Sequence, residues 1–146
     1  FKLNKDIHKI MNKISNLGYK NFVVTNQPDI SRGLMDLKEL EKMNKYLLSN
    51  LPIDEIYFCP HDNKDDCNCR KPKAGMFLEA LNKYKLDTFE CFVVGDRITD
   101  LIAAKKAKIK SLFLLERNYS LRGYENQNNC TEYYKINELK DLNSFF

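Results

Sequence analysis

Apolar residues recur along the chain at the spacing of an amphipathic helix. The first such stretch has apolar residues at positions 7, 10, 11, 14 and 17 and stops at Gly18, so it predicts a helix over residues 4–17. A second helix begins at the capping box of Asp36 and Glu39 and ends before Pro52. The same periodicity predicts two more helices, over residues 76–84 and 98–107.

Short apolar runs lie between these helices and predict β-strands. They cover residues 21–25, 53–59, 91–95 and 111–115, with residues 133–136 as an edge strand before a short terminal helix. The continuous apolar run at 91–95 is typical of a parallel strand buried on both faces. The alternation predicts an α/β fold with a doubly wound, mostly parallel, Rossmann-like sheet. The length of 146 residues predicts one domain over residues 1–146.

Charge and hydropathy argue against nucleic-acid and membrane partners. Lys and Arg number 24 against 20 Asp and Glu, and they are dispersed along the chain, which favours a solvated surface. No apolar run approaches the roughly 18 residues of a transmembrane helix, and no signal peptide precedes the first helix. We therefore expect a cytoplasmic protein, either a monomer or an oligomer of unknown size.

The segment over residues 59–72 carries a candidate metal site. Cys59, His61, Cys67 and Cys69 follow the pattern C-x-H-x5-C-x-C, and three thiolates with one imidazole are the ligand set of a closed, structural zinc site. A disulfide cluster is the alternative, but it would leave His61 unexplained, and the chain has an odd number of cysteines, five. We therefore predict a loop that Zn²⁺ folds in place of a hydrophobic core.

Three polar segments follow predicted strands. They are Thr25, Asn26 and Gln27 after the first strand, Arg70 and Lys71 after the cysteine-rich loop, and residues 95–100 after the third strand. In open parallel sheets, ligands bind at the carboxyl ends of the strands. A hydroxyl, two cations and the carboxylates of Asp96 and Asp100 at one edge would suit a phosphate and Mg²⁺, because hard oxygen ligands bind Mg²⁺ and cations neutralise phosphoryl oxygens.

These residues resemble the haloacid dehalogenase superfamily of phosphatases, specifically its zinc-containing branch, over residues 1 to about 115. The resemblance implies that Thr25 hydrogen-bonds the transferring phosphoryl group and that Lys71 stabilises it. It also implies that Asp96 binds Mg²⁺, with Asp100 as a second candidate ligand, and that Asn26, Gln27 and Arg70 contact the substrate. Zn²⁺ would shape the loop that presents Arg70 and Lys71, in place of the large cap domain of many relatives.

Two details favour the sugar bisphosphatases of this branch, which act on D-glycero-D-manno-heptose 1,7-bisphosphate, over histidinol-phosphatase. They are the sequences at residues 30–33 and 74–76. Arg97 departs from this pattern, since the heptose enzymes commonly have Lys there. The resemblance thus implies an enzyme of carbohydrate metabolism that removes the 7-phosphate through an aspartyl-phosphate intermediate.

One family motif is absent from the sequence. The superfamily attacks phosphate with the first Asp of an Asp-x-Asp pair that follows an apolar strand, and no such pair occurs here. Because the chain begins with Phe1 and only three residues precede the first predicted helix, we expect an N-terminal segment with this strand in the complete protein.

Each assignment has a simpler alternative. Asp96 could only cap the following helix, Asp100 could only favour its N-terminus, and Arg70 and Lys71 could be surface charges. Arg32 could contact substrate or solvate its own loop. At the level of function, the alternatives are histidinol-phosphatase and a non-catalytic zinc-binding module on the same scaffold.

Overall fold

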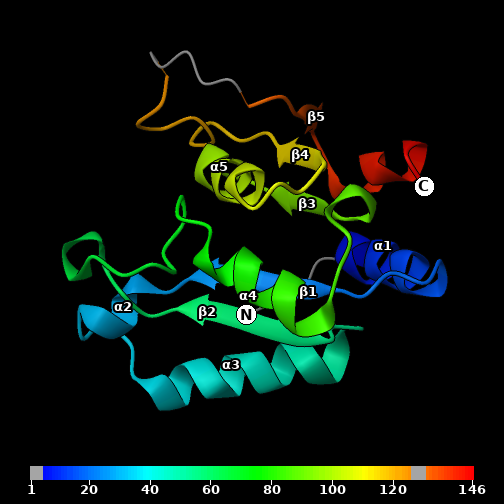
Figure 1. Ribbon diagram of the computed structural model, residues 1–146. Coiled ribbons are helices and arrows are strands. Elements are labelled where there is room, and N and C mark those ends of the chain that lie inside the picture. Colours follow the sequence, from blue (N-terminus) through cyan, green and yellow to red (C-terminus); the bar gives the residue numbers. More distant parts are fainter. Residues whose placement is uncertain (1–4, 126–130) are drawn as a thin grey trace. The chain divides into compact units, whose positions relative to one another are not determined.

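The computed structural model of the protein describes residues 5–125 and 131–146 (Figure 1). Helices and strands alternate along the described chain. The chain divides into two compact units, one formed by Phe1–Cys67 with Leu142–Phe146 and the other by Asn68–Asp141. Each unit is described separately below.

The first unit contains a parallel pair of strands. Its elements are α1 (Lys5–Asn16), β1 (Phe22–Asn26), α2 (Pro28–Ser31), α3 (Leu37–Asn50), β2 (Glu55–Cys59) and the 3-10 turn η1 (Asn63–Asp65). Strands β1 and β2 pair in register from Phe22 opposite Glu55 to Asn26 opposite Cys59. The carboxyl ends of both strands therefore lie side by side, which brings residues 25–27 next to the start of the cysteine-rich loop.

Helices α1 and α3 form where the sequence predicts them, whereas α2 was not predicted. The Asp36 side chain accepts a hydrogen bond of 2.8 Å from the backbone N–H of Glu39 and caps α3. Part of each apolar stripe is buried: Ile10 and Ile14 on α1 are each 4% exposed, and Leu40 on α3 is 1% exposed. Leu37 and Leu48 on α3 are 49% and 45% exposed.

The second unit contains a sheet of three parallel strands. Its elements are α4 (Gly75–Tyr84), the 3-10 turn η2 (Thr88–Glu90), β3 (Phe92–Gly95), α5 (Ile98–Lys106), β4 (Ser111–Leu115) and β5 (Tyr134–Ile136). The strand order is β3-β4-β5, and every pairing is parallel. Helix α5 packs against β3 and β4, and its residues Leu101, Ala103 and Ala104 are fully buried. A last 3-10 helix, η3 (Leu139–Ser144), contains the boundary between the units.

The α/β class with parallel sheets is confirmed. The predicted edge strand over 133–136 is β5, and the predicted terminal helix is the 3-10 helix η3. The strand predicted from residue 53 begins only at Glu55, because Ile53 and Asp54 donate their N–H groups to Leu51 and Asn21 instead. The start of the first predicted helix, residue 4, lies outside the described residues. The assignment of residues 1–146 to one domain stays a prediction.

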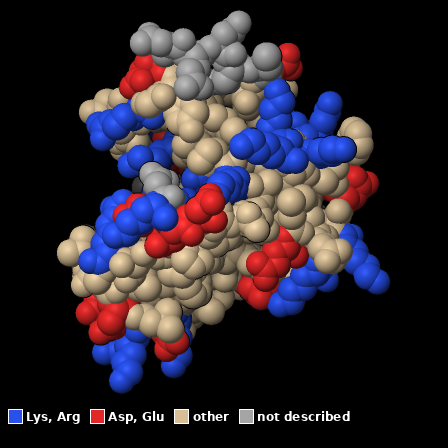
Figure 2. Space-filling view, turned by 60° about the vertical axis from the view of Figure 1, so that its left-hand side comes forward, with Lys and Arg blue, Asp and Glu red and all other residues tan. Residues whose placement is uncertain are grey.

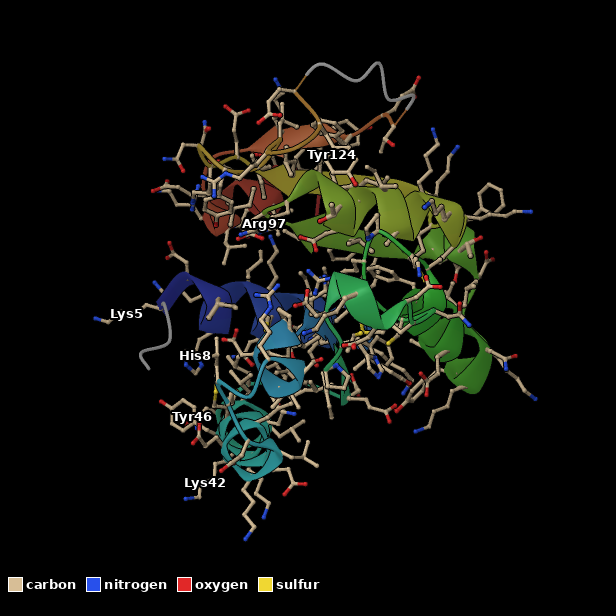
Figure 3. All side chains as sticks on the ribbon, turned by 90° about the vertical axis from the view of Figure 1, so that its left-hand side faces the viewer. Lys5, His8, Lys42, Tyr46, Arg97 and Tyr124 are labelled. Atoms are coloured by element: carbon tan, nitrogen blue, oxygen red, sulfur yellow. The ribbon has the colours of Figure 1, made fainter. Side chains whose placement is uncertain are left out.

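The surface carries charges of both signs. On the face shown in Figure 2, basic and acidic side chains are both present, and in several places they adjoin one another. Figure 3 shows Lys42 and Tyr46 projecting from α3 and Lys5 and His8 from α1. Among the described residues, no helix is both long enough and apolar enough to cross a membrane.

Candidate functional site

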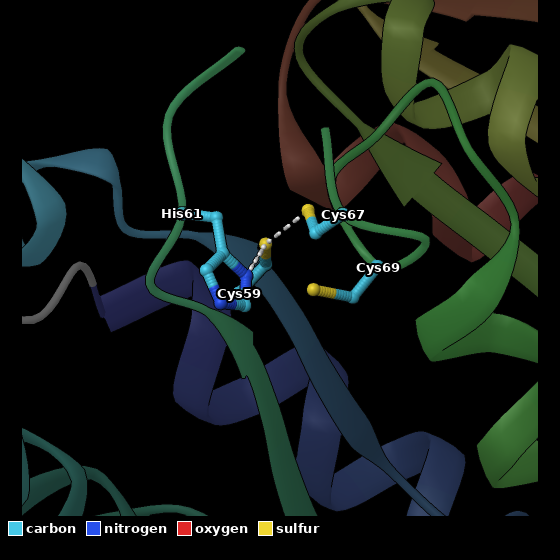
Figure 4. Close-up of side chains that lie close together, drawn as sticks. All are labelled: Cys59, His61, Cys67 and Cys69. Atoms are coloured by element: carbon cyan, nitrogen blue, oxygen red, sulfur yellow. Dashed lines mark hydrogen bonds between the residues drawn. The ribbon is translucent and has the colours of Figure 1, made fainter. Parts of the chain in front are cut away.

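A cluster of four side chains that could hold a metal ion begins at the end of β2 (Figure 4). Cys59 is the last residue of β2 and is fully buried. Its Sγ atom lies 3.4 Å from Nδ1 of His61 and 3.4 Å from Sγ of Cys67. Cys69 completes the cluster, in which all ligand atoms lie within 4.8 Å of one another.

The donor set fits a closed metal centre. Tetrahedral zinc sites have Zn–S bonds of about 2.3 Å and Zn–N bonds of about 2.0–2.1 Å, which place neighbouring ligand atoms roughly 3.5–3.8 Å apart. The two separations of 3.4 Å are close to these values, and all four ligand atoms lie within 4.8 Å of one another, so side-chain movements of about 1 Å or less would accommodate an ion. Three thiols and an imidazole fill all four positions and leave none for a catalytic water. None of the described cysteines forms a disulfide.

Helix α2 and the residue after it hold the cysteine-rich loop. Arg32 donates two hydrogen bonds to the carboxylate of Asp62, from Nε at 2.6 Å and from a terminal nitrogen at 2.9 Å. Ser31 donates its hydroxyl to Asp65 at 2.5 Å, and the backbone N–H of Asp62 donates to the same carboxylate at 2.7 Å. The Ser31 hydroxyl is the main cause that lowers the pKa of Asp65. Arg32 thus has a partner in the loop that neither sequence-based alternative named.

The polar residues after β1 lie against this loop. Thr25 and Asn26 end the strand, and the backbone N–H of Gln27 donates to the carbonyl of Cys59 at 2.6 Å. The Gln27 side chain donates to Oγ1 of Thr25 at 3.4 Å. The first unit therefore groups three of the predicted substrate-contacting residues beside the cysteine-rich loop.

In the second unit, Lys71 and Asp100 form an ion pair. Nζ of Lys71 lies 2.6 Å from Oδ1 of Asp100, and the two side chains are only 10% and 13% exposed. Oδ2 of Asp100 accepts a hydrogen bond of 3.2 Å from the backbone N–H of Arg97. Asp100 therefore supports the first turn of α5 and also orients Lys71, so both oxygens of this carboxylate are engaged.

Asp96 lies in the turn between β3 and α5. Arg97, not Asp96, occupies the N-cap position of α5, so helix capping does not explain this carboxylate. Oδ2 of Asp96 instead accepts a hydrogen bond of 2.5 Å from the hydroxyl of Tyr119, and this bond is the main cause that raises the pKa of Tyr119. The hydroxyl of Ser120 donates to the Asp96 carbonyl at 2.6 Å.

Tyr119 and Ser120 were missed in the sequence. They belong to the segment that follows β4, of which residues 126–130 lie outside the described part. The rule that ligand sites form at the carboxyl ends of parallel strands could have found them, because this loop leaves β4, the neighbour of β3.

The geometry of Asp96 suits a hard metal ion. Within the described residues, Oδ2 has Tyr119 as its partner and no hydrogen bond or ion pair reaches Oδ1. A carboxylate oxygen of this kind is a normal ligand of Mg²⁺. The predicted convergence of Thr25 with Lys71 and Asp96, and the contact of Arg70 with substrate, stay predictions.

The parallel sheets and the polar turns at their carboxyl ends define an α/β protein with candidate phosphate and metal ligands in these turns. The HAD-hydrolase-like family model matches residues 68–142, just over half of the 146 residues, and the chain belongs to this family. The predicted membership of the haloacid dehalogenase superfamily is thereby confirmed.

Within the family, the chain is similar to several sugar bisphosphatases. It is 36% identical to D-glycero-beta-D-manno-heptose-1,7-bisphosphate 7-phosphatase of Helicobacter pylori over 81% of this chain and 72% of that protein. It is 33% identical to D-glycero-alpha-D-manno-heptose-1,7-bisphosphate 7-phosphatase of Campylobacter jejuni over 88% of this chain and 72% of that protein. The crystal structure of D,D-heptose 1,7-bisphosphate phosphatase from B. bronchiseptica, complexed with magnesium and phosphate, matches with a TM-score of 0.79 and 25% identity over 98% of this chain and 84% of that chain.

Proposed function

We propose that the protein is a Mg²⁺-dependent phosphatase that removes the 7-phosphate of D-glycero-D-manno-heptose 1,7-bisphosphate. The observation that carries this proposal is the 36% identity, over most of the chain, to a phosphatase named for that substrate. The grouping of Lys71, Asp96 and Asp100 in the second unit supplies the cation and carboxylates that this chemistry requires.

Each charged residue of the second unit has a proposed role that follows from its charge and its contacts. Asp96 is the proposed Mg²⁺ ligand through Oδ1, and Mg²⁺, when bound, supplies positive charge to the phosphoryl oxygens. Lys71 neutralises the same phosphoryl group, and Asp100 holds the Lys71 ammonium in position through its ion pair. Because both oxygens of Asp100 already have protein partners, we assign Asp96 rather than Asp100 as the direct ligand.

The residues of the first unit are proposed to bind the substrate. Thr25 donates its hydroxyl to the phosphoryl group, and Asn26 and Gln27 contact the substrate together with Arg70. The nucleophile implied by the family, an Asp in an Asp-x-Asp pair, is not among the residues of this sequence. The proposal therefore concerns the full natural chain.

The cysteine-rich cluster is proposed to bind Zn²⁺ for structure rather than chemistry. The four donors leave no ligand position for water, and Arg70 and Lys71 follow Cys69 directly in the sequence. Zn²⁺ would therefore fix the segment from which both cations extend. Because thiolate ligands must stay reduced, we also propose the cytoplasm as the compartment.

Phosphate release by the full natural chain tests the proposed activity. Asp96→Asn should lower Mg²⁺-dependent release from heptose 1,7-bisphosphate at least about a hundredfold, since metal charge is worth several kcal/mol in the transition state. Asp87→Asn is a matched control, because Asp87 caps the η2 turn and Asn is an equally good capping residue. Full activity in Asp96→Asn would contradict the assignment.

Substrate comparison tests the specificity. The relatives include enzymes named for the β and for the α anomer, so both anomers should be assayed beside histidinol phosphate. Preference for either heptose anomer would support the proposal. Preference for histidinol phosphate would replace it with the other enzyme of the branch, and no turnover of any of the three would favour a zinc-binding module without activity.

A further inference from the structure

The loop that follows β4 supports the loop that carries Asp96. Strands β3 and β4 are neighbours with Gly95 opposite Leu114, so the two loops leave the sheet side by side. Ser120 is 3% exposed and joins both, because its hydroxyl donates to the Asp96 carbonyl at 2.6 Å and its own carbonyl accepts the N–H of Ile98 at 2.8 Å. The backbone that follows the Asp96 side chain is thereby held at two points, the Asp96 carbonyl and the Ile98 N–H.

Tyr119 acts on the side chain itself. Its hydroxyl donates to Oδ2 of Asp96 at 2.5 Å. The Arg97 guanidinium, at the N-terminus of α5 (Figure 3), lies over the Tyr119 ring at 5.1 Å from its centroid. The ring therefore has its own support, which limits rotation of the hydroxyl away from the carboxylate.

This arrangement holds one carboxylate oxygen and leaves the other available. A short Asp side chain can rotate about two bonds, and each rotation would move Oδ1 away from the metal position. Hydrogen bonds from neighbouring groups commonly orient metal-ligating carboxylates in this way. Resting on the proposed function, we propose that Tyr119 is a positioning residue that orients the Asp96 carboxylate for Mg²⁺, while Ser120 fixes the backbone of Asp96.

A competing role is distinguishable from this one. If the Tyr119 hydroxyl occupied the place of the metal, its removal would tighten Mg²⁺ binding. The geometry favours orientation, because the hydroxyl hydrogen-bonds to Oδ2 and the neighbouring Ser120 is bound to the same residue by a separate hydrogen bond.

Titration of Mg²⁺ into the substrate-free, full natural chain by calorimetry tests the proposal. Tyr119→Phe deletes the hydroxyl and keeps the ring. Tyr134→Phe is the matched control, because its ring stacks on Phe113 in β4 and its residue is 55% exposed. We expect Tyr119→Phe to weaken Mg²⁺ binding about 10–100-fold, the usual effect of losing a group that orients a metal ligand. Tyr134→Phe should bind as the wild type does.

The remaining outcomes also decide the question. Unchanged or tighter binding in Tyr119→Phe overturns the proposal, and a melting temperature in metal-free buffer shows whether the variant is folded. Should it not fold, Ser120→Ala gives an independent test, since weaker Mg²⁺ binding is expected there as well and unchanged binding would contradict the role of this loop.

A parallel activity assay separates this inference from the proposed function. Wild-type protein that binds Mg²⁺ but releases no phosphate would refute the proposed activity, while the effect of Tyr119→Phe on binding would still decide the positioning role. Wild-type protein that does not bind Mg²⁺ at all would refute both.

Discussion

At the scale of single residues, Gly95 shows how closely the backbone of β3 packs against the Asp100 side chain. A Cβ atom at this position would lie 2.6 Å from Cβ and 2.7 Å from Oδ2 of Asp100, which is closer than atoms in proteins normally approach. The absence of a side chain therefore allows Asp100 to reach both the N–H of Arg97 and the ammonium of Lys71. Glycine is needed here for space rather than for an unusual backbone conformation.

Gly95→Ala should consequently reduce activity through Asp100. The added methyl group would push Asp100 away from Lys71, and a misplacement of about 1 Å in a positioned group can lower the rate about a hundredfold. We expect phosphate release to fall by roughly 10–100-fold, measured at saturating Mg²⁺ and substrate.

Gly18→Ala provides the control for this substitution. Its added methyl group would meet nothing within 4 Å, but the φ of +98° makes any side chain strained there. It should lower stability by about 1–2 kcal/mol and keep the catalytic rate of the folded protein. Wild-type activity in Gly95→Ala would contradict the role given to the close approach.

At the scale of elements, the long amphipathic helices and the buried strands could be predicted from the sequence. The apolar periodicity of α1 and α3 and the run of β4 depend on local pattern alone, so their bounds agree within about two residues of the prediction. Helix α2 could not be found this way, because four residues are too few to show a period.

The same contrast between local and distant contacts holds for the candidate site. The cysteine cluster was predicted because its ligands come in two close pairs along the chain. The partners of Asp96 were not, since Tyr119 is 23 residues away and its contact depends on which strands become neighbours. Likewise the pairing of Arg32 with Asp62, 30 residues apart, has no local signal.

The cysteine-rich loop has little regular structure of its own, and its stability should depend on bound metal. Cys69→Ser should reduce the zinc content from about one ion per chain to well below one, and should lower the melting temperature, because binding of a structural metal contributes directly to folding. Metal analysis by mass spectrometry and thermal unfolding would measure both.

Cys91→Ser is the matched control for the cluster. This thiol precedes β3 and lies outside the cluster, and burial is the main cause that raises its pKa. The variant should retain its zinc. A chelator should also lower the melting temperature of the wild type and of Cys91→Ser more than that of Cys69→Ser; equal effects on all three would count against a structural metal.

At the scale of the whole molecule, the candidate groups are distributed over two units. The first holds Thr25 and three of the four candidate zinc ligands, and the second holds Lys71, Asp96 and Asp100. A bound phosphate with Mg²⁺ is expected to stabilise the folded chain as any ligand of the native state does, by about 2.7 kcal/mol at a hundredfold excess over its dissociation constant.

Thermal unfolding of the full natural chain would show this effect. Inorganic phosphate and Mg²⁺ together should raise the melting temperature, and each alone should raise it less. Asp96→Asn should lose the combined effect, because the metal would lack its proposed ligand. The same shift in this variant and in the wild type would place the binding elsewhere.

Because two sulfur atoms of the cluster lie close together, formation of a disulfide bond would compete with metal binding. Sγ of Cys59 and Sγ of Cys67 are 3.4 Å apart, about 1.4 Å longer than a disulfide bond of roughly 2.05 Å. A bound ion would hold both sulfurs as ligands and keep them from joining. Once the ion is lost, an oxidant could link the two cysteines, and the two remaining ligands could not rebuild a four-coordinate site. Reversible loss of metal would then become lasting inactivation that only a reductant could reverse.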